Sequence, residues 1–259
     1  MSAEDRRTRL LELVRVRRFA SPPELAAELQ VSESTIRRDL EQLEEQGSIT
    51  RTHGGVLYAG HSPKLPHFEA RQPTKWAEKR AIAQRTVELI HDGDTVLLDG
   101  GTTTYEVARL LVGRPLHVVT NSLPVANLFA SDTISDLVVI GGNICPRTGV
   151  AQGPMADGML AGLRVRKTIL SVAGINEEGF FNNSLLLVNT ERAMMKAADE
   201  VIVVADSSKF GHSSLALLGQ LGAVRHVITD NGVADVWRER LVAAGVSLLV
   251  AEVEKGDEG

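Results

Sequence analysis

The sequence contains little cysteine and few aromatic residues, and each shortage excludes a class of protein. Cys145 is the only cysteine among 259 residues, so no disulfide can form within the chain, which suits a reducing cytosol. The seven histidines are scattered, without the Cys/His spacing of metal-ligand clusters. We therefore expect no structural or catalytic metal, and no cofactor.

Long hydrophobic runs are also missing. Apolar stretches such as "VIVVA" at 201–205 have the length of a strand and are far too short to span a membrane. Residues 4–9 are rich in charge and no apolar stretch follows them, so we expect no secretory signal and a cytoplasmic protein. The net charge of −5 argues against a chain that coats nucleic acid indiscriminately, but a local basic surface could still bind DNA.

Two blocks with different patterns are present. The first sixty residues show helical periodicity, whereas from about residue 93 short apolar strands alternate with helical stretches. Between the blocks, residues 60–75 contain three prolines and little periodicity, which is typical of a linker. We expect a first domain over 1–58, a linker over 59–75, a second domain over 76–253 and an acidic tail over 254–259.

The first block predicts two helices with strong start signals and a hairpin. Ser21 is placed as an N-cap, and Glu24 closes a capping box. Ser32 can cap the next helix, in which Ile36, Leu40 and Leu43 recur at i, i+4 and i+7 and must face a core. Residues 48–58 then alternate around a His-Gly-Gly turn, as a small hairpin does. Helix, short turn, helix and hairpin together are the layout of a winged helix-turn-helix.

In that layout the first turns of the second helix enter the major groove of double-stranded DNA, and the wing contacts the backbone. The candidate DNA contacts are the exposed polar residues of that helix start and of the hairpin: Ser32, Ser34, Thr35, Arg37, Arg38, Arg51 and His53. The competing interpretation is a solvated helix face. The acidic residues lie mostly late in the helix, away from the proposed reading end, which favours DNA binding.

The second block predicts an open, mostly parallel α/β sheet. Most of the expected strands are rich in Val, Ile and Leu without alternation, as in strands that are buried on both faces. They lie at 95–99, 117–120, 136–140, 168–172, 201–205 and 226–229, with a possible edge strand at 247–251. Helical segments at 105–111, 123–130, 190–199 and 234–244 separate them, which indicates right-handed crossovers.

Polar residues and glycines follow most of these strands, at the edge where open parallel sheets bind ligands. Glycines let a backbone approach a ligand closely, and N–H groups at a helix start favour an anion such as phosphate. The candidate effector-binding residues at this edge are Asp99, Gly100, Gly101, Thr102, Thr103, Thr104, Thr120, Asn121, Ser122, Gly141, Gly142, Gly174, Asp206, Ser208 and Lys209. A Gly-Gly turn can also serve packing alone. Neither a Walker A sequence nor a dinucleotide fingerprint is present.

The run "VSESTIRRDLEQLEEQG" followed by "RTHGG" resembles the DNA-binding signature of the DeoR family of bacterial transcriptional regulators. The resemblance continues through "LLDGGTTT", "VVTNS", "VIGGN" and "VVADSSKFG". It implies a homo-oligomeric repressor, a dimer or tetramer, whose second domain senses a small phosphorylated sugar or a related metabolite. We therefore expect a sequence-specific regulator of a carbohydrate-metabolism operon that binds operator DNA and no membrane.

The second block also resembles sugar-phosphate isomerases, in which a carboxylate moves a proton and a lysine holds the substrate. The isomerase's acidic positions have no clear match here, but Glu191 is a carboxylate that could face a bound sugar and is a further expected effector contact, with a solvated helix face as the alternative. Lys196 lies on the same segment, and Asn182 and Asn183 either bind sugar hydroxyls or form a turn. The isomerase's lysine-glycine run is missing, so an enzyme with an appended DNA-binding domain is the alternative function and a regulator is the favoured one.

Overall fold

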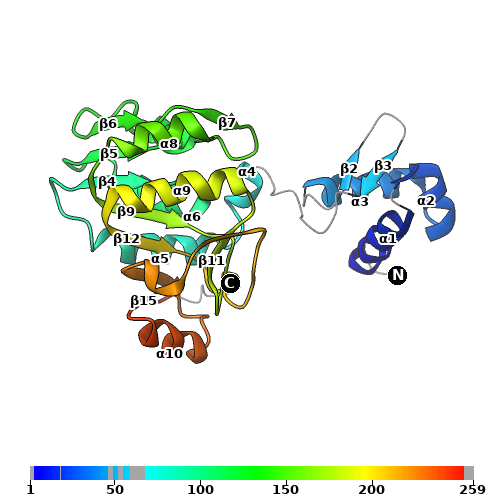
Figure 1. Ribbon diagram of the computed structural model, residues 1–259. Coiled ribbons are helices and arrows are strands. Elements are labelled where there is room, and N and C mark those ends of the chain that lie inside the picture. The colour runs from blue at the N-terminus through cyan, green and yellow to red at the C-terminus, as the bar shows by residue number, and fades with distance from the viewer. Residues whose placement is uncertain (1–2, 18, 46–48, 52–54, 59–67, 254–259) are drawn as a thin grey trace, which may run out of the picture. The chain divides into compact units, whose positions relative to one another are not determined.

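The computed structural model describes residues 3–17, 19–45, 49–51, 55–58 and 68–253 (Figure 1). The chain divides into two compact units between Ala70 and Arg71. Each unit has its own hydrophobic core, and each is described here by itself.

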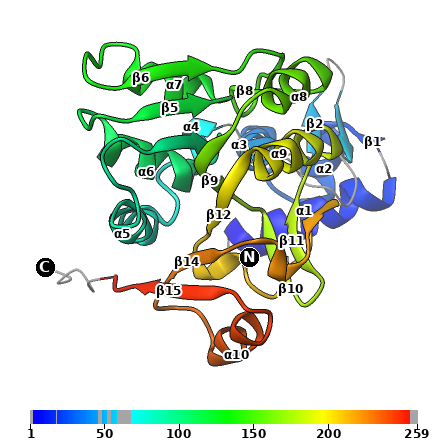
Figure 2. The same ribbon diagram turned by 60° about the vertical axis from the view of Figure 1, so that its left-hand side comes forward.

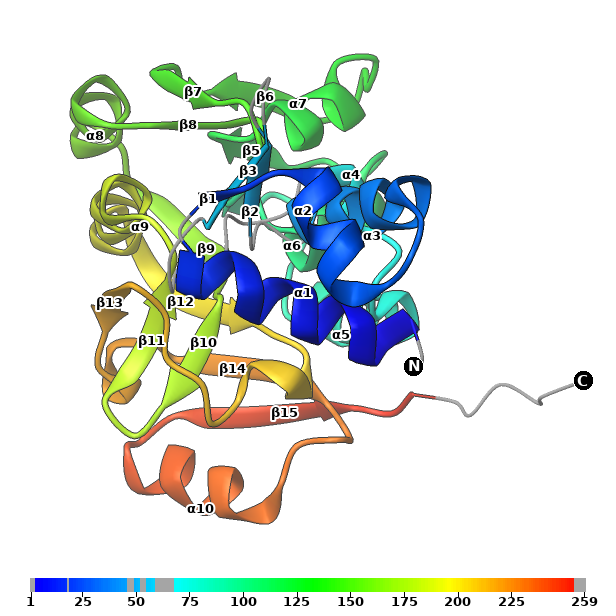
Figure 3. The same cartoon turned by 90° about the vertical axis from the view of Figure 1, so that its right-hand side faces the viewer.

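The N-terminal unit is a winged helix-turn-helix. Its elements are α1 (Ala3–Arg17), β1 (Phe19–Ala20), α2 (Pro22–Leu29), α3 (Glu33–Glu45), β2 (Ile49–Arg51) and β3 (Val56–Tyr58). The three short strands form an antiparallel sheet in the order β1-β3-β2, and α2 and α3 pack against α1 (Figure 3). The two antiparallel strands of the predicted hairpin are confirmed, while its His-Gly-Gly turn lies outside the described residues. β1 was not predicted because two residues carry no periodic signal.

Both predicted helix caps are confirmed. The backbone N–H of Ser21 donates to Oε2 of Glu24 at 2.8 Å, as a capping box requires. At the start of α3, the N–H of Thr35 donates to Oγ of Ser32 at 3.2 Å. Ile36 and Leu40 are buried in the core of the unit, as the spacing predicted.

The C-terminal unit is built on a seven-stranded parallel sheet in the order β15-β14-β12-β9-β4-β5-β6. Its strands are β4 (Thr95–Leu98), β5 (His117–Thr120), β6 (Asp136–Val139), β9 (Val165–Ser171), β12 (Ala198–Val204), β14 (His226–Asp230) and β15 (Ser247–Ala251). All six predicted strands and the possible edge strand are present. The ladders are parallel throughout, so the carboxyl ends of the strands share one edge.

Helices cover both faces of this sheet (Figure 2). They are α5 (Trp76–Val87), α6 (Thr102–Leu111), α7 (Leu123–Phe129), α8 (Pro154–Ala161), α9 (Leu185–Ala197) and α10 (Asp235–Ala243), with 3₁₀ turns at Ser207–Lys209 and Leu221–Ala223. The short helix α4 (Phe68–Arg71) lies at the boundary between the two units. The core on one face includes residues of α5, α6 and α7, and the core on the other includes residues of α8, α9 and α10. The last part of the predicted linker, from residue 68, is therefore partly helical.

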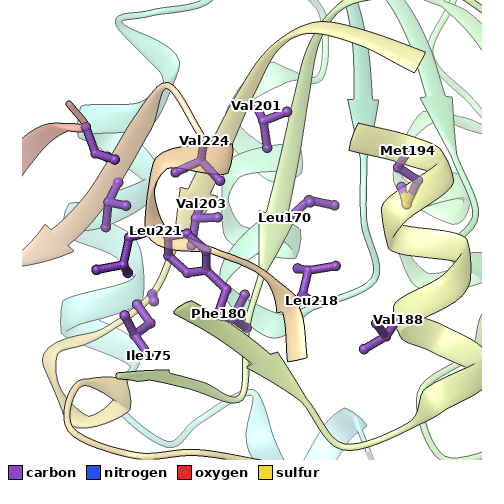
Figure 4. Packing of buried hydrophobic residues seen from close by; sticks show 14 of the residues in the cluster. Leu170, Ile175, Phe180, Val188, Met194, Val201, Val203, Leu218, Leu221 and Val224 are labelled. Carbon is purple, nitrogen blue, oxygen red and sulfur yellow. The ribbon is translucent and has the colours of Figure 1, made fainter. Parts of the chain in front are cut away.

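A second, three-stranded antiparallel sheet extends one core. Its strands are β10 (Gly174–Asn176), β11 (Gly179–Asn182) and β13 (Ala216–Gly219). Phe180 of β11 is fully buried beside Leu221 and Val203 (Figure 4). A separate hairpin pairs β7 (Asn143–Cys145) with β8 (Val150–Gln152). These elements and α8 were not predicted.

One expectation about burial was wrong. The strand at 136–140 was expected to be buried on both faces, but β6 is the edge strand of the sheet, and three of its four residues are exposed. Val138 and Val139 are 45% and 42% exposed. Burial within the C-terminal unit therefore does not explain the continuous apolar pattern of this strand.

Candidate functional sites

The start of α3 presents the predicted DNA-contacting residues. Ser34, Arg37 and Arg38 are exposed, on the side of the helix opposite to its buried residues. Oγ of Ser32 lies 2.9 Å from Oγ of Ser34 and 2.8 Å from Oγ1 of Thr35, so the cap belongs to a small hydroxyl cluster. Nη2 of Arg37 lies 3.4 Å from Oε2 of Glu33, an exposed pair that is weak in water and can open toward a phosphate.

The wing residues are less fully described. Arg51 ends β2 and pairs with Val56 of β3, which places it beside the turn of the hairpin. His53, also predicted to contact DNA, lies outside the described residues. Asp39, which sequence reasoning missed, is buried on α3 and accepts from Nε of Arg6 at 2.5 Å and from Nη2 at 3.1 Å. This double contact fixes the reading helix against α1.

The Gly-Gly turn after β4 is shaped by packing. Gly101 is the N-cap of α6, and Thr102 to Thr104 form its first turn. A Cβ on Gly100 would lie 2.0 Å from Cγ2 of Val150, and a Cβ on Gly101 would lie 1.7 Å from Oγ of Ser171. Both positions therefore require glycine. The packing role does not occupy the N–H groups at the start of α6, which remain suited to an anion.

Most polar side-chain groups of the residues after β5 make hydrogen bonds that hold neighbouring elements, and one acceptor has no partner in the described part of the chain. Oγ1 of Thr120 donates to the carbonyl of Leu98 at 2.7 Å, and Oγ of Ser122 accepts from the N–H of Val125 as the cap of α7. Nδ2 of Asn121 donates to the carbonyl of Ala151 at 3.0 Å, which holds β8. In the described part of the chain, the buried Oδ1 of Asn121 has no hydrogen-bond partner.

Two of the three later glycines have packing explanations. Gly141 is exposed, and its N–H donates to Sδ of Met159 at 3.3 Å. A Cβ on Gly142 would lie 3.1 Å from the carbonyl oxygen of Gln152. Gly174 belongs to β10 rather than to the parallel sheet, and a Cβ there would lie 2.5 Å from the carbonyl oxygen of His212. These contacts account for Gly142 and Gly174 without a ligand, whereas no contact among the described residues requires a glycine at position 141.

Asp99 and Glu191 form a buried carboxyl pair. Oδ2 of Asp99 accepts from Oγ of Ser171 at 3.3 Å, and Oε1 of Glu191 accepts from Nδ2 of Asn182 at 2.6 Å. The same Asn182 amide donates to the carbonyl of Ser171 at 3.2 Å, which links the two carboxyls. Glu191 is fully buried, so the alternative of a solvated helix face is wrong.

Burial changes the proton affinity of this pair. It raises the pKa of Asp99, and backbone and side-chain hydrogen bonds offset only part of that effect. Burial and the nearby Asp99 charge raise the pKa of Glu191 well above its usual range. Oε2 of Glu191 has no partner among the described residues, so it is open to a hydrogen bond from a bound molecule.

Cations gather near the carboxyls, and sequence reasoning found only one of them. Asp206 accepts from the N–H of Ser208 at 3.1 Å and lies 3.8 Å from Nζ of Lys209. Lys79 is 5% exposed, and its Nζ donates to the carbonyl of Arg71 at 2.6 Å. Burial lowers the pKa of Lys79 to about 8, against an opposing attraction from Asp206 and with added repulsion from Lys209.

Arg71 is the third cation of this group. Burial lowers its pKa, while the charge of Asp99 acts in the opposite direction. Its Nε is buried without a hydrogen-bond partner in the ranges described. Arg71, Lys79 and Lys209 thus lie near the acidic groups at the carboxyl edge of the sheet. Together they have more N–H donors than the nearby carboxylates and carbonyls accept. We name them the cation cluster.

Other charged residues lie apart from this edge. Lys196 is exposed on α9, and Glu177 and Glu178 form the exposed turn between β10 and β11, where Glu177 pairs with Arg240 at 2.5 Å. Within the described ranges, no group of three or more His, Cys, Asp or Glu residues could hold a metal ion. A search of the same residues finds no helix long and apolar enough to cross a membrane.

A winged helix-turn-helix head joined to an open parallel α/β unit defines a class of protein, the transcriptional regulators with a separate sensor domain. Comparison with family models identifies a DeoR-like helix-turn-helix domain over residues 6–61 and a DeoR C terminal sensor domain over residues 74–231. The chain therefore belongs to the DeoR family, as the sequence resemblance implied.

Curated relatives match over almost their whole length. The transcriptional repressor AccR of Agrobacterium fabrum is 35% identical over 234 residues, 89% of this chain and 91% of AccR. The glycerol-3-phosphate regulon repressor of Escherichia coli is 34% identical over 236 residues, 89% and 92% of the two chains. The repressor GlcR of Bacillus subtilis is 31% identical over 258 residues and covers both chains completely. The chain is thus a DNA-binding transcriptional repressor rather than an enzyme.

Among solved structures, the ribose 5-phosphate isomerase A of Methanocaldococcus jannaschii is similar to 53% of this chain and 55% of its own. The sequence identity is 18% and the TM-score 0.40. At this level the likeness carries no argument, and the α/β fold is established by the order and direction of the strands themselves.

Proposed function

We propose that this repressor controls an operon of carbohydrate metabolism and responds to a phosphorylated sugar bound at the carboxyl edge of its parallel sheet. One observation carries the proposal: the same edge combines the cation cluster, of which Lys79 is buried, with the start of α6 and with buried carboxyl and amide oxygens that lack partners among the described residues. The name of the glycerol-3-phosphate regulon repressor, a relative over nine-tenths of its length, points to the same class of metabolite.

The phosphate end of the effector belongs with the cation cluster. Lys79 and Lys209 provide ammonium groups, Arg71 a guanidinium, and the N–H groups of Thr102 and Thr103 the positive end of a helix. Charge-assisted hydrogen bonds from such donors are about twice as strong as neutral ones. Burial is the main cause of the lowered pKa of Lys79, and a phosphate dianion would balance the repulsion from Lys209 and Arg71 that adds to it.

The sugar end belongs with the unpaired oxygens. Oε2 of Glu191 and Oδ1 of Asn121 are buried without partners in the described structure, and each costs free energy unless a donor reaches it. Sugar hydroxyls are donors of the right kind. In this arrangement Asp99 and Asn182 hold Glu191 in position, and they do not transfer protons.

The DNA end is the start of α3. Ser34 and Thr35 lie where base edges are read, and Arg37 and Arg38 lie where a phosphate or a guanine is contacted. Paired half-sites require paired reading heads, so we propose a homo-oligomer, a dimer or tetramer, that acts on operator DNA in the cytoplasm. The effector changes DNA binding only to the extent that it favours one arrangement of subunits over another.

The test is a gel-shift titration on DNA upstream of the protein's own operon, repeated with a panel of sugar phosphates. Lys209→Ala should bind DNA normally and lose the response to the effector, whereas Lys196→Ala, an exposed lysine on α9, should retain it. A normal response in Lys209→Ala would refute the effector site.

The DNA interface has its own test. Arg38→Ala should weaken binding, and if the guanidinium contacts a phosphate the dependence of log K on log salt should become shallower by about 1. An unchanged affinity and salt dependence would remove Arg38 from the interface.

A further inference from the structure

The turn Ser207–Lys209, which we name the lysine turn, is held in place on the side of β14. Asp230, the last residue of β14, is buried, and its Oδ1 accepts from the backbone N–H of Ser207 at 2.7 Å. Its Oδ2 accepts from the N–H of Gly232 at 3.0 Å, and a Cβ on Gly232 would lie only 2.6 Å from Oγ of Ser207. A buried carboxylate and a close-fitting glycine thus fix the start of the turn.

The other side of the lysine turn is held by β10 and by an aromatic pair. The N–H of Gly211 donates to the carbonyl of Ile175 at 2.8 Å, and Phe210 pairs with the same residue as a β-bridge. The centroid of the Phe210 ring lies 5.7 Å from that of Trp237 on α10, with 56° between the two planes. Both residues are more than nine-tenths buried, and a tilted pair at this distance is attractive. Trp237 therefore packs against the residue that follows Lys209.

Trp237 is held in turn by Arg240. The central carbon of the Arg240 guanidinium lies 4.8 Å from the centroid of the Trp237 ring, and its Nη2 pairs with Oε1 of Glu177 at 2.5 Å. Glu177 lies directly after β10, so the contacts form a closed ring from the lysine turn through β10 and α10 and back to the turn. Figures 2 and 3 place α10, β10 and β14 at the same end of the C-terminal unit. We name Phe210, Trp237, Arg240 and Glu177 the aromatic clamp.

The ammonium group of Lys209 is less restrained than the backbone that carries it. Its Nζ lies 3.8 Å from Oδ2 of Asp206 and 3.4 Å from Oγ of Ser208, and the side chain is 38% exposed. Both contacts are long, and an exposed ion pair contributes little free energy, so the ammonium can turn toward a bound phosphate at low cost. A fixed backbone beneath a weakly paired cation is the arrangement that a preorganised anion donor requires.

We propose that Trp237 is a positioning residue of the effector site: through Phe210 it sets the point from which Lys209 reaches the phosphate. The inference rests on the proposed function, because it presupposes that Lys209 binds an anion. A smaller side chain at position 237 leaves space beside Phe210 and lets the lysine turn shift. A shift of about 1 Å is large against a charge-assisted hydrogen bond of about 2.8 Å, so the ammonium would have to be brought back at the expense of affinity.

The experiment measures the affinity of the full-length protein for inorganic phosphate and for the panel of sugar phosphates by calorimetric titration. Trp237→Leu should lower the affinity for each ligand that binds the wild type by about fivefold or more. Trp237→Phe keeps a ring beside Phe210 and should stay within about twofold of the wild type. Leu241→Ala is the matched control, because it opens a cavity at a fully buried residue of the same helix and should also stay within about twofold.

A second pair of variants leaves the core intact. Glu177→Arg replaces the partner of Arg240 with a like charge at a side chain that is 71% exposed, so the protein should fold. The affinity of this variant should be about threefold lower than that of Glu178→Arg, which makes the same change in net charge at the next residue of the same exposed turn.

The outcomes separate this inference from the proposed function. A wild-type protein that binds none of these ligands would overturn the effector site and the role of Trp237 with it. Affinity that Trp237→Leu leaves unchanged, that Trp237→Phe does not restore or that Leu241→Ala lowers as much would overturn the positioning role and leave the effector site in place. If Trp237→Leu does not fold, equal affinities of Glu177→Arg and Glu178→Arg would overturn it.

Discussion

Glu191→Gln should make the stability of the C-terminal unit less sensitive to pH. Gln has the shape of a protonated Glu and keeps the oxygen that accepts from Asn182 at 2.6 Å. It differs from Glu191 because it cannot ionise, and Glu191 is fully buried beside Asp99. The substitution therefore removes one ionisation and changes little of the packing.

The sign follows from the direction of the pKa shift. In the unfolded chain Glu191 titrates near its ordinary value of 4.5, whereas in the folded protein burial and the Asp99 charge raise its pKa well above that. Between these two values the folded protein binds more protons, so the free energy of unfolding falls as pH rises, by up to about 1.4 kcal/mol per pH unit. The contribution is fully present below pH 4.5 and is lost as pH rises above it.

Thermal unfolding followed by tryptophan fluorescence measures this effect. Both tryptophans, Trp76 and Trp237, belong to the C-terminal unit, so the signal reports that unit alone. A change of 1.4 kcal/mol corresponds to about 3–5 °C in a unit of this size. The melting temperature of Glu191→Gln minus that of the wild type should therefore rise by up to that amount for each pH unit above 5.

The control is Glu178→Gln, which removes an exposed carboxylate from the turn between β10 and β11. Its difference from the wild type should be small at every pH. Other carboxyl groups are shared by the compared proteins and largely cancel. A difference for Glu191→Gln that does not change between pH 5 and 8 would refute the assignment of Glu191 as a buried, protonated carboxyl.

Three further predictions concern the turn after β4, the reading helix and the cation cluster. Gly101→Ala should cost about 1–3 kcal/mol in chemical denaturation, because its Cβ would displace Ser171, whereas Gly158→Ala, with open space on α8, should be neutral or stabilise by up to about 1 kcal/mol. Equal changes in the free energy of unfolding for the two variants would contradict the packing role of Gly101. Ser32→Ala should lower the stability of the N-terminal unit by about 1 kcal/mol and reduce the helical circular dichroism of α3. An unchanged melting temperature would contradict the role of Ser32 as the cap of α3. Effector affinity, measured by calorimetric titration, should fall above pH 8 as Lys79 loses its proton, and a Lys79→Met protein with the same pH profile would exclude that cause.

Much of the fold was predictable because local patterns record burial. The parallel strands are runs of Val, Ile and Leu, and the caps at Ser21 and Ser32 use side chains that act within three residues. The β7–β8 hairpin and the second sheet were not predictable, because strands of three or four residues hold no visible period. Their existence depends on pairing partners that the sequence does not show.

The candidate site was predicted in part, for the same reason. Asp99 and Thr102 follow a strong strand signal. Lys79 was missed because a lysine in a helix is ordinarily exposed, yet it lies one turn before the buried Ile82 on the apolar side of α5. Glu191 likewise lies on the buried stripe between Val188 and Met194. A charged residue at an apolar position of a helix was thus the signal that could have found both.

The β7–β8 hairpin touches three parts of the protein at once. Val150 fills the space that the missing side chain of Gly100 leaves, Asn121 holds Ala151 through two hydrogen bonds, and the N–H of Gly153 donates to Thr190, the neighbour of Glu191. With a 2.0 Å gap to a Gly100 Cβ position, the turn after β4 has no slack on this side. A side chain at position 100 would therefore have to displace Val150 and with it β8, which ties the shape of the turn to the position of the hairpin.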